Sequence, residues 1–345
     1  MNRLKYLNTD PIPLLMEAQN PALLFFVRRD LLEERTGPAS ELWELPEPTK
    51  ALRRQQADGS WRFPGMSQYK YPAINHDLYE TFKQLRMLVE KYGFNRSHPA
   101  IHAAAEYLFS CRTAEGDLRG ILGNQHMPYY NGVILDLLNQ AGYTGDKRAL
   151  DALAWLKSYR VDDGGWFMPM LTADYKDPSI WSAPPLPLDR SQRSSHNLTG
   201  MALRGFVSHP RYRKSRWVRA ACILLKESFF KPDRYGFRKA PSYWTKFQYP
   251  FFWSSLLTAM DSLSLAGFSD GDEDIRRGID WFASNQGRDG LWYTMYEKTK
   301  TRKPKDRDSD IENRMWIALA VCRMLRRLQE VSCTKRVLKK EGKKS

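Results

Sequence analysis

Cysteine and histidine are scarce in this chain of 345 residues, which holds four cysteines and six histidines. The cysteines stand far apart, at Cys111, Cys222, Cys322 and Cys333, and none shows CxxC spacing. We therefore expect free thiols in a reducing compartment rather than a disulfide framework. We also expect no metal and no cofactor. Only His98 and His102 have a spacing that could bind a metal, and they open a helix that is expected to be solvated.

Long apolar runs are missing as well. No stretch approaches the roughly 18 apolar residues that a membrane span needs, and the N-terminus has no signal-peptide core. We therefore expect a cytoplasmic protein. The net charge is +15, and the segment 331–345 is a basic tail for which weak contact with an acidic surface is an alternative to plain solvation. No basic stripe alternates with stacking aromatics, which argues against a nucleic-acid partner.

A repeated ending organises the rest of the chain. The segments 55–61 (QQADGSW), 160–166 (RVDDGGW) and 286–292 (QGRDGLW) share an Asp-Gly pair and a tryptophan two residues after the glycine, and 114–118 and 232–237 are weaker copies. Glycine can take positive φ and stop a helix, and the following aromatic can fold back on its last turn. Such self-similarity marks a repeat fold in which each unit is a helix pair.

Amphipathic and more hydrophobic helices are expected to alternate along the chain. The amphipathic stretches that precede the endings, with apolar residues at helical spacing, are 98–111, 147–159, 215–229 and 273–286. The more hydrophobic helices, expected to lie inside, are 21–34, 76–92, 127–141, 196–207, 249–266 and 310–328. The short stretch 11–18 can supply a further outer helix. The pattern predicts an all-α fold of about six inner and six outer helices, with an open solenoid as the alternative.

The repeated endings resemble those of squalene–hopene cyclases and the β-subunits of protein prenyltransferases. The block from Ser194 to Gly200, with Phe229 to Asp233, Tyr243 to Phe247 and Pro250 to Trp253, is similar to prokaryotic proteins that carry prenyltransferase/squalene-oxidase repeats. The resemblance implies a single closed α/α toroid over 1–330, a terpenoid-cyclase-like fold, and an apolar small-molecule substrate. Fold alone does not transfer function.

Two site patterns of those families are absent. The Asp-x-Asp-Asp motif, whose carboxylic acid protonates an alkene, does not occur, and its nearest strings are 270–274 and 308–310. The first string is expected to cap a helix, and the second to open an inner helix and face the cavity. No Asp-x-Cys occurs, so the zinc site of a protein prenyltransferase is not expected.

The starts of the inner helices are rich in polar and aromatic residues and predict a ligand site at one mouth of the barrel. Candidate catalytic residues are Asp77, His76, His196 and Glu312. Candidate substrate-binding residues are His126, Tyr129, Tyr130, Asn131, Asn197, Tyr249, Phe252, Trp253, Asp310 and Trp316. His76 and His196 are expected at equivalent places in their repeats. The aromatics either stabilise a carbocation through their ring faces or simply fill the barrel.

Asp77 is the preferred acid, since a carboxyl among aromatics holds its proton more readily. The long loop 167–195, rich in proline and aromatics, is expected to cover the site as a lid, with a surface crossing as the alternative. Three functions remain open. They are acid-initiated cyclisation of an isoprenoid or other long apolar substrate, saccharide binding or chemistry on an acidic glycan, and a non-catalytic binding ring.

Overall fold

The computed structural model describes residues 4–65, 71–173, 177–236, 238–293 and 304–341, without the side chains of 304–309 and 332–341. Phe237 of the weak ending, Tyr175 of the predicted lid and the end of the basic tail, 342–345, lie outside the described residues. The chain divides into two compact units. Unit 1 comprises 1–37, 222–232 and 240–345, and unit 2 comprises 38–221 and 233–239.

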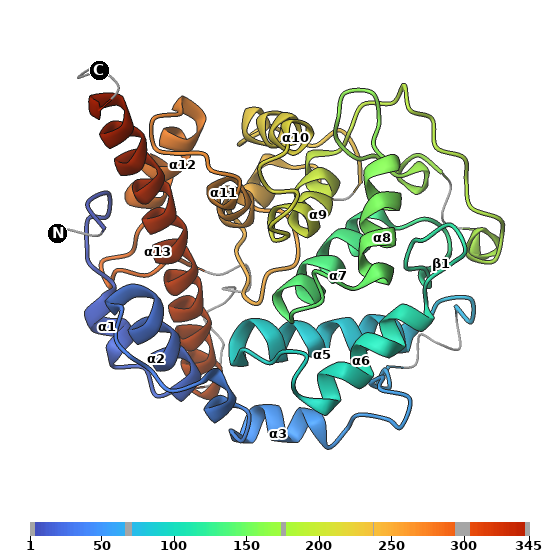
Figure 1. The fold of residues 1–345 in the computed structure, drawn as a ribbon, viewed down its shortest axis with the longest axis horizontal. Helices are drawn as coiled ribbons and strands as arrows, with labels where there is room; N and C mark the ends of the chain where they lie inside the picture. The colour runs from blue at the N-terminus through green and yellow to red at the C-terminus, as the bar shows by residue number, and fades with distance from the viewer. Residues whose placement is uncertain (1–3, 66–70, 174–176, 237, 294–303, 342–345) are drawn as a thin grey trace. The chain divides into compact units, whose positions relative to one another are not determined.

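Unit 2 is built from paired helices (Figure 1). Its hydrophobic helices are α5 (His76–Tyr92), α7 (Pro128–Gln140) and α9 (His196–Val207), and α7 packs on both α5 and α9. The other helices of the repeats are α3 (Pro46–Leu52), α6 (Pro99–Ser110) and α8 (Lys147–Ser158). Of these, α3 and α6 pack on α5, and α8 packs on α7 and α9. The predicted helices 76–92, 127–141 and 196–207 are confirmed to within a residue at each end.

Glycines allow α7 and α9 to approach closely. A Cβ atom on Gly132 would lie 2.3 Å from the Cα atom of Ala202, and one on Gly205 would lie 2.9 Å from the carbonyl oxygen of Gly132. Any side chain at Gly132 would push the helices apart, because the atom it meets is backbone. This contact joins the first half of α7 to the second half of α9 within unit 2.

The repeated endings do what their sequence predicts. All five glycines (Gly59, Gly116, Gly164, Gly236 and Gly290) have positive φ. The indole N–H groups of Trp61, Trp166 and Trp292 donate to the carbonyl ten residues earlier, in the last turn of the preceding helix, at 2.8 to 2.9 Å. All three rings are buried. The tryptophans therefore seal the helix ends, as expected.

The glutamines of the endings tie each repeat to its neighbour. Gln55 Nε2 donates to the carbonyl oxygens of Gly59 at 2.9 Å and Ala100 at 2.8 Å. Gln286 Nε2 repeats the pattern in unit 1, with bonds of 2.9 Å to Gly290 and 2.7 Å to Thr9. One side chain thus closes its own turn and caps the next segment, which explains why the glutamine recurs.

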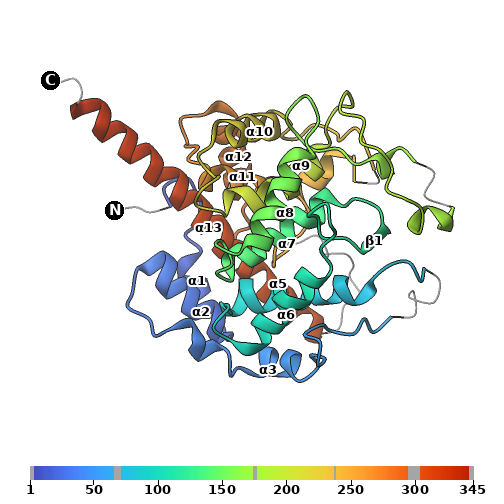
Figure 2. The same ribbon diagram turned by 45° about the vertical axis from the view of Figure 1, so that its right-hand side comes forward.

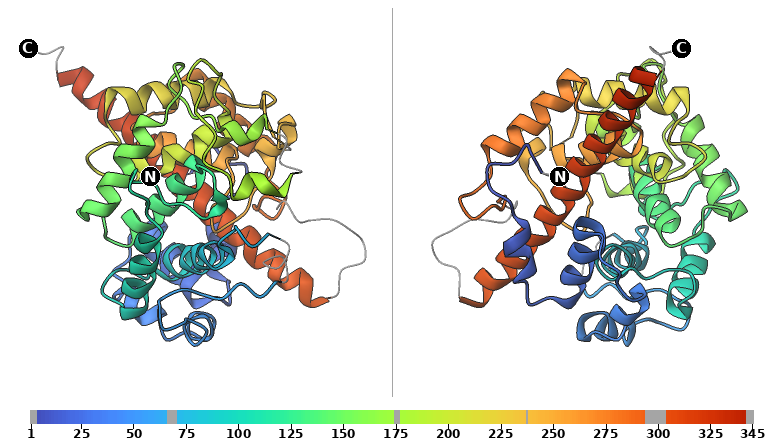
Figure 3. Two further views of the ribbon diagram at one scale, coloured as in Figure 1. Left: turned by 90° about the vertical axis from the view of Figure 1, so that its right-hand side faces the viewer. Right: turned by 60° about the vertical axis from the view of Figure 1, so that its left-hand side comes forward.

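Unit 1 contains α1 (Ile12–Met16), α2 (Pro21–Val27), α11 (Leu256–Leu265), α12 (Glu273–Ser284) and the long α13 (Pro304–Glu341). A π-helical turn, Arg28–Leu32, continues α2, and the side chain of Asn20 caps the start of α2. α13 packs on α2 and α11, and α12 packs on α11. Figure 3 shows the blue α1 and α2 beside the red α13. The remaining helix is α10 (Arg216–Glu227), whose residues up to Ala221 belong to unit 2 and whose residues from Cys222 belong to unit 1.

Two predicted helix starts in unit 1 were wrong. The helix expected over 249–266 begins at Leu256, because Ser255 forms a reciprocal cap with Thr258 and Pro250 in the preceding stretch has no N–H to donate. The helix expected from 310 begins at Pro304, so Asp310 lies inside α13 rather than at its start. α13 also continues through most of the segment predicted as a basic tail. The predicted domain boundary stays a prediction.

The loop 167–195 is closed at its base and docked along its length. Ser195 N donates to Trp166 O at 2.9 Å, and Arg190 donates to the carbonyl oxygens of Arg160 and Ser158 at the end of α8. Its middle contains the 3₁₀ turns Pro169–Leu171 and Pro178–Trp181. Figure 2 shows the second turn beside the short strand β1 (Ile121–Asn124), which it contacts. The loop is therefore an ordered part of unit 2 where it is described.

Twelve α-helices account for about half of the described residues, which are all-α apart from β1 and short bridges. Further 3₁₀ turns lie at Ala39–Leu42 and Pro241–Thr245. Among the described helices, none combines the length and apolar character needed to cross a membrane.

Candidate functional site

The start of α9 joins a histidine to a buried carboxylate. Ser195 caps α9, its Oγ accepting the N–H of Leu198 at 3.1 Å. Two groups donate to Asp233 Oδ2, namely Ser195 Oγ at 2.8 Å and the backbone N–H of Asn197 at 2.9 Å. The imidazole Nε2 of His196 lies 3.6 Å from the same oxygen. These contacts fix Asp233 beneath the histidine, and its side chain is 1% exposed against 12% for His196.

His196 is poised as a proton acceptor. Burial lowers the pKa of His196, and the negative charge of Asp233 opposes this effect in part. At 3.6 Å the contact is electrostatic rather than a hydrogen bond. An imidazole that is neutral at pH 7 and sits beside a carboxylate can take up a proton that the carboxylate then stabilises. The predicted residue thus has the surroundings of a general base.

Asn197 adds a polar group without a partner. Its residue is buried, and its side-chain Oδ1 has no hydrogen-bond partner among the described residues. A buried acceptor without a donor costs free energy and calls for an explanation such as a ligand. The adjacent His196 and Asn197, both predicted from sequence, therefore offer a base and an acceptor at one helix start.

The start of α7 contributes a cluster of aromatic rings. Tyr130 packs against Tyr129, Tyr79 and Phe82, with ring centroids 4.5, 6.2 and 5.9 Å away. Burial raises the pKa of both Tyr129 and Tyr130, so the phenols stay protonated at neutral pH. The positive charges of Arg86 and Arg238 oppose this rise at Tyr130. The cluster is apolar in its rings and polar at its rim.

The segment 233–239 contacts the start of α9 and carries a charge that acts on the start of α7. Asp233 contacts the start of α9, and the charge of Arg238 acts on Tyr130 at the start of α7. Between them, the ring of Tyr235 packs against Phe167, the first residue of the loop 167–195, at 5.0 Å. The described residues of 233–239 therefore connect the His196 pair, the tyrosine cluster and the base of the loop.

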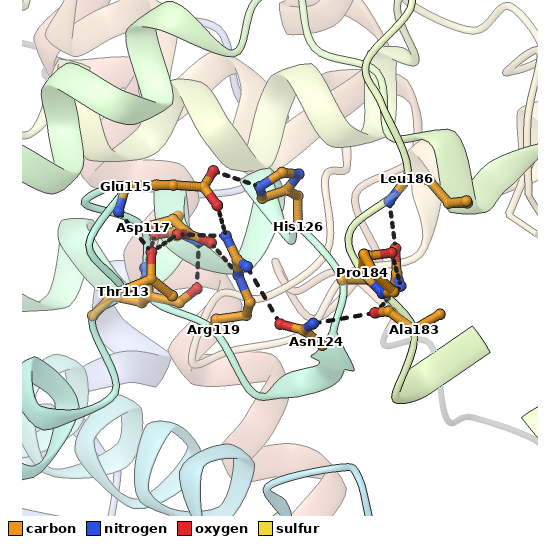
Figure 4. Close-up of polar contacts among 12 residues, drawn as sticks. Thr113, Glu115, Asp117, Arg119, Asn124, His126, Ala183, Pro184 and Leu186 are labelled. Atoms are coloured by element: carbon orange, nitrogen blue, oxygen red, sulfur yellow. Dashed lines mark hydrogen bonds and ion pairs between the residues drawn. The ribbon is translucent and has the colours of Figure 1, made fainter. Parts of the chain in front are cut away.

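His126 belongs to a polar cluster of its own, shown in Figure 4. Its Nε2 lies 3.0 Å from Glu115 Oε2, and Arg119 bridges Glu115 and Asp117 at 2.9 and 3.0 Å. The ring also packs against Trp155 and Tyr159. Among the described contacts none joins His126 to Asp77. Its predicted part in substrate binding stays a prediction.

His76 and Asp77 hold the segment after Trp61 against α5. Asp77 Oδ1 accepts the backbone N–H of Phe63 at 2.7 Å, and the ring of His76 packs against that of Phe63 at 5.0 Å. The acid role of Asp77 is not tested by these contacts and stays a prediction.

The expected equivalence of His76 and His196 was wrong. Thr81 and Thr199 each accept the backbone N–H of a repeat tryptophan at 3.0 Å, and they define the true register. Asn131 accepts the N–H of Leu118 in the same way. His196 stands three residues before its threonine and His76 five residues before, so Leu78 is the counterpart of His196. Asn131 also donates to the carbonyls of Leu118 and Met127, so its amide braces an ending.

The other predicted residues lie in unit 1. Glu312 accepts from Asn20 Nδ2 at 2.9 Å and from the indole of Trp316 at 3.2 Å. The ring of Tyr249 stacks on Trp316 at 5.3 Å with an interplanar angle of 7°. Phe252 and Trp253 pack on each other, and Asp310 is half-buried within α13. The sharing of one cavity by Glu312 and Asp77 stays a prediction.

A buried ionic cluster joins the three central helices of unit 2. Arg204 of α9 donates to Asp136 of α7 at 2.9 Å and to Glu90 of α5 at 3.1 Å. All three residues are buried, and Gln140 donates to the other oxygen of Asp136. The inner helices therefore carry charge in their last turns, away from the starts that hold the tyrosines and His196.

Metal ligation finds no support in the described part of the chain, where no three His, Cys, Asp or Glu side chains are grouped to hold an ion. Cys111, Cys222 and Cys322 are free thiols. The expectation that the protein binds no zinc stays a prediction.

Sequence reasoning missed Asp233 and Arg238. Asp233 is the aspartate of the weak ending 232–237, and its Oδ1 accepts the N–H of Tyr235 at 3.2 Å, as Asp163 accepts that of Gly165 at 3.0 Å. The ending marks Asp233 as a turn residue, but its partners Ser195 and Asn197 belong to the helix before that ending, so the motif does not indicate them. Arg238 carries no such signal.

No family model matches the sequence, and no curated protein matches it. Among solved structures, the chain overlaps a variant of the type II terpene cyclase MstE from Scytonema in complex with merosterolic acid A, with a TM-score of 0.38 and 12% identity over 90% of this chain and 99% of that one. For the apo enzyme the TM-score is 0.32 and the identity is 12%, over 85% of this chain and 99% of that one. For a variant in complex with geranylgeranyl dihydroxybenzoate the TM-score is 0.32 and the identity is 14%, over 85% of this chain and 98% of that one. We assign no function from overlaps this loose.

Proposed function

We propose that the chain binds and transforms an isoprenoid or other long apolar substrate by acid–base chemistry at the starts of α7 and α9. The observation that carries this proposal is the pairing of a neutral, half-buried His196 with the buried carboxylate of Asp233. A base of this kind has a use in a site that creates or removes protons on carbon.

The remaining groups fit such a substrate. The rings of Tyr129 and Tyr130, together with Tyr79 and Phe82, supply an aromatic wall, and their faces stabilise positive charge on a hydrocarbon. The unpartnered oxygen of Asn197 accepts a hydrogen bond from a polar end of the ligand.

In an acid-initiated cyclisation, a carboxylic acid gives a proton to an alkene carbon and leaves a carbocation. New carbon–carbon bonds form, and a base then takes a proton from a neighbouring carbon to restore a double bond. We assign the base to His196. Asp77 and Glu312 are the candidates for the acid, and the net reaction is an isomerisation.

We further propose that the helices close into a single α/α toroid of about six inner and six outer helices, with the loop 167–195 as its lid. The proposal rests on the repeated endings and on the two rows of central helices, α5, α7 and α9 in unit 2 and α2, α13 and α11 in unit 1. Tyr249, Trp316, Phe252, Trp253, Asp310 and His126 are then further wall residues.

A second candidate function is chemistry on, or binding of, an acidic glycan. It is favoured by the positive charges of Arg86 and Arg238 beside Tyr130, which suit a carboxylate-bearing ligand better than a hydrocarbon. Here His196 would take the proton next to the sugar carboxylate.

Incubation with geranylgeraniol and farnesol, followed by mass spectrometry, tests the proposal. We expect a product of unchanged mass with the wild type, its loss in His196→Gln, and its retention in His102→Gln. His102 is the matched control because its side chain is 63% exposed. Equal activity of wild type and His196→Gln would contradict the proposed base. Absence of product and of binding for both alcohols, with turnover of a uronate oligosaccharide, would replace the apolar class by the second candidate.

A further inference from the structure

A pocket on unit 1 is lined by none of the candidate site residues named above. It has a volume of about 290 Å³ and is lined by Phe230, Arg277, Asp280, Trp281, Ser284 and Asn285. All but Phe230 come from α12 and its C-cap. The pocket is a shallow depression open to solvent, and its volume suits a single ring rather than a chain.

The aromatic walls of this pocket are only half-buried. Phe230 follows α10, and its φ of 63° is in the left-handed region, which a bulky residue rarely adopts. The preceding Phe229 is buried against Trp244, so the turn at Phe230 directs the next ring away from that core contact. Strained backbone that the surrounding packing enforces is a feature of binding sites. Trp281 packs one edge on Phe247 and leaves part of its surface accessible.

The polar groups follow one stripe of α12. Successive residues of the stripe are three or four positions apart, from Arg277 through Asp280 and Trp281 to Ser284. They therefore share one face of the helix. The guanidinium of Arg277 lies 5.7 Å from the ring centre of Phe230 and pairs with Asp274 at 3.2 Å. Asp280 and Ser284 are exposed to solvent, and their side chains have no hydrogen-bond or ion-pair partner among the described residues. The stripe therefore presents acceptors and a donor between two aromatic rings.

We propose that this pocket binds a saccharide ring. The apolar C–H face of a pyranose packs on an aromatic ring, while its hydroxyls donate to Asp280 and to Asn285 Oδ1 and accept from Ser284 and Arg277. A carboxylate beside a guanidinium suits paired hydroxyls, which donate to one group and accept from the other. A simple cation fits less well, because Arg277 repels it. The site is independent of the acid–base site at α9.

Saturation-transfer NMR with glucose, galactose, mannose, cellobiose and maltose tests the proposal. We expect transfer from the wild-type protein to the ring protons of at least one sugar, and at least a tenfold weaker affinity for it in Asp280→Ala and in Trp281→Ala. Asp280 has no partner to lose, so its variant remains informative if Trp281→Ala folds poorly.

Glu273→Gln is the matched control, since it removes one acidic charge from the exposed surface of the same helix outside the pocket. It should bind the sugar as the wild type does, and so should His196→Gln, which separates this site from the proposed function. No transfer to any of the five sugars, or transfer that Asp280→Ala leaves unchanged, would overturn the proposal.

Discussion

The indole N–H of each repeat tryptophan closes a helix end, and this predicts two separable losses at one residue. Trp166→Phe keeps most of the ring but leaves the carbonyl of Leu156 without its donor, which costs about 1–3 kcal/mol of unfolding free energy. Trp166→Ala also removes the buried ring and costs about 3–5 kcal/mol. Urea unfolding measures both.

The control for this pair is Tyr293→Ala, because Tyr293 is a large hydrophobic residue that is 63% exposed. It should change the free energy of unfolding by no more than about 0.5 kcal/mol. Similar losses for Trp166→Phe and Tyr293→Ala would show that the indole hydrogen bond does not stabilise the ending.

His196 predicts a pH dependence of stability whose sign follows from its lowered pKa. As the pH falls below about 6.5, the unfolded chain takes up a proton on this residue before the folded protein does. The contribution of His196 to stability is therefore present above that pH and is lost as the pH falls through the folded-state pKa. His196→Gln should lose less unfolding free energy between pH 7.5 and 5 than the wild type loses.

Urea unfolding of both proteins at the two pH values measures this difference. His102→Gln, the exposed control, should keep the wild-type loss. An identical pH dependence of wild type and His196→Gln would mean that the imidazole titrates alike in the folded and unfolded chain.

Between elements, the buried cluster of Arg204, Asp136 and Glu90 ties α5, α7 and α9 together. Arg204→Met keeps much of the volume but leaves two buried carboxylates without their cation. We expect it to cost about 3–5 kcal/mol of unfolding free energy. Adding Asp136→Asn and Glu90→Gln to Arg204→Met should restore part of that loss, because the uncompensated charges are then gone.

The comparison variant is Arg54→Met, since Arg54 is exposed and makes no described side-chain contact. Its unfolding free energy should stay within about 0.5 kcal/mol of the wild type. A triple variant no more stable than Arg204→Met would show that lost packing, rather than unpaired charge, explains the effect.

Gln125 fastens the loop 167–195 to the segment that follows β1. Its Nε2 donates to the carbonyls of Ile180, Ala183 and Pro184 at 2.8, 3.2 and 3.3 Å, and its Oε1 accepts the N–H of Leu186 at 2.9 Å. We expect Gln125→Ala to speed amide exchange over 177–186 about tenfold, which corresponds to about 1.4 kcal/mol of opening free energy. Hydrogen-exchange mass spectrometry measures it.

Gln192→Ala serves as the control within the same loop, because the amide of Gln192 bonds only to Asp189. Exchange over 177–186 should remain at the wild-type rate in that variant. An unchanged rate in Gln125→Ala would show that other contacts hold the loop.

Elements that depend on local signals were predictable from sequence. The apolar periodicity placed helix starts at Pro21 and His196, where Asn20 and Ser195 cap the helices, and the Asp-Gly-x-Trp endings placed the stops. The start of α11 was not, because the aromatic stretch from Tyr249 reads as helix by hydrophobicity while the reciprocal cap at Ser255 decides the boundary. Local capping overrides composition there.

At the scale of the whole molecule, contacts between segments far apart in the sequence limit how much of the site can be predicted from sequence. Sequence reasoning selected His196, Asn197 and Tyr130 because helix starts gather polar residues. It missed Asp233, whose partner Ser195 is 38 residues earlier, since nothing in either segment encodes the contact. The predicted equivalence of His76 and His196 was also wrong, because the repeat register depends on which threonine accepts each tryptophan N–H. These donors and acceptors are 20 and 33 residues apart in the sequence.

The central claim is that an apolar substrate binds at the starts of α7 and α9, beside His196 and Asp233. Photolabelling with a diazirine analogue of geranylgeraniol, followed by peptide mass spectrometry, tests it most directly. The account predicts labelled residues within 128–133, 196–200 and 233–239, with labelling suppressed by unmodified geranylgeraniol. Labelling confined to other segments, or unaffected by the competitor, would contradict the account.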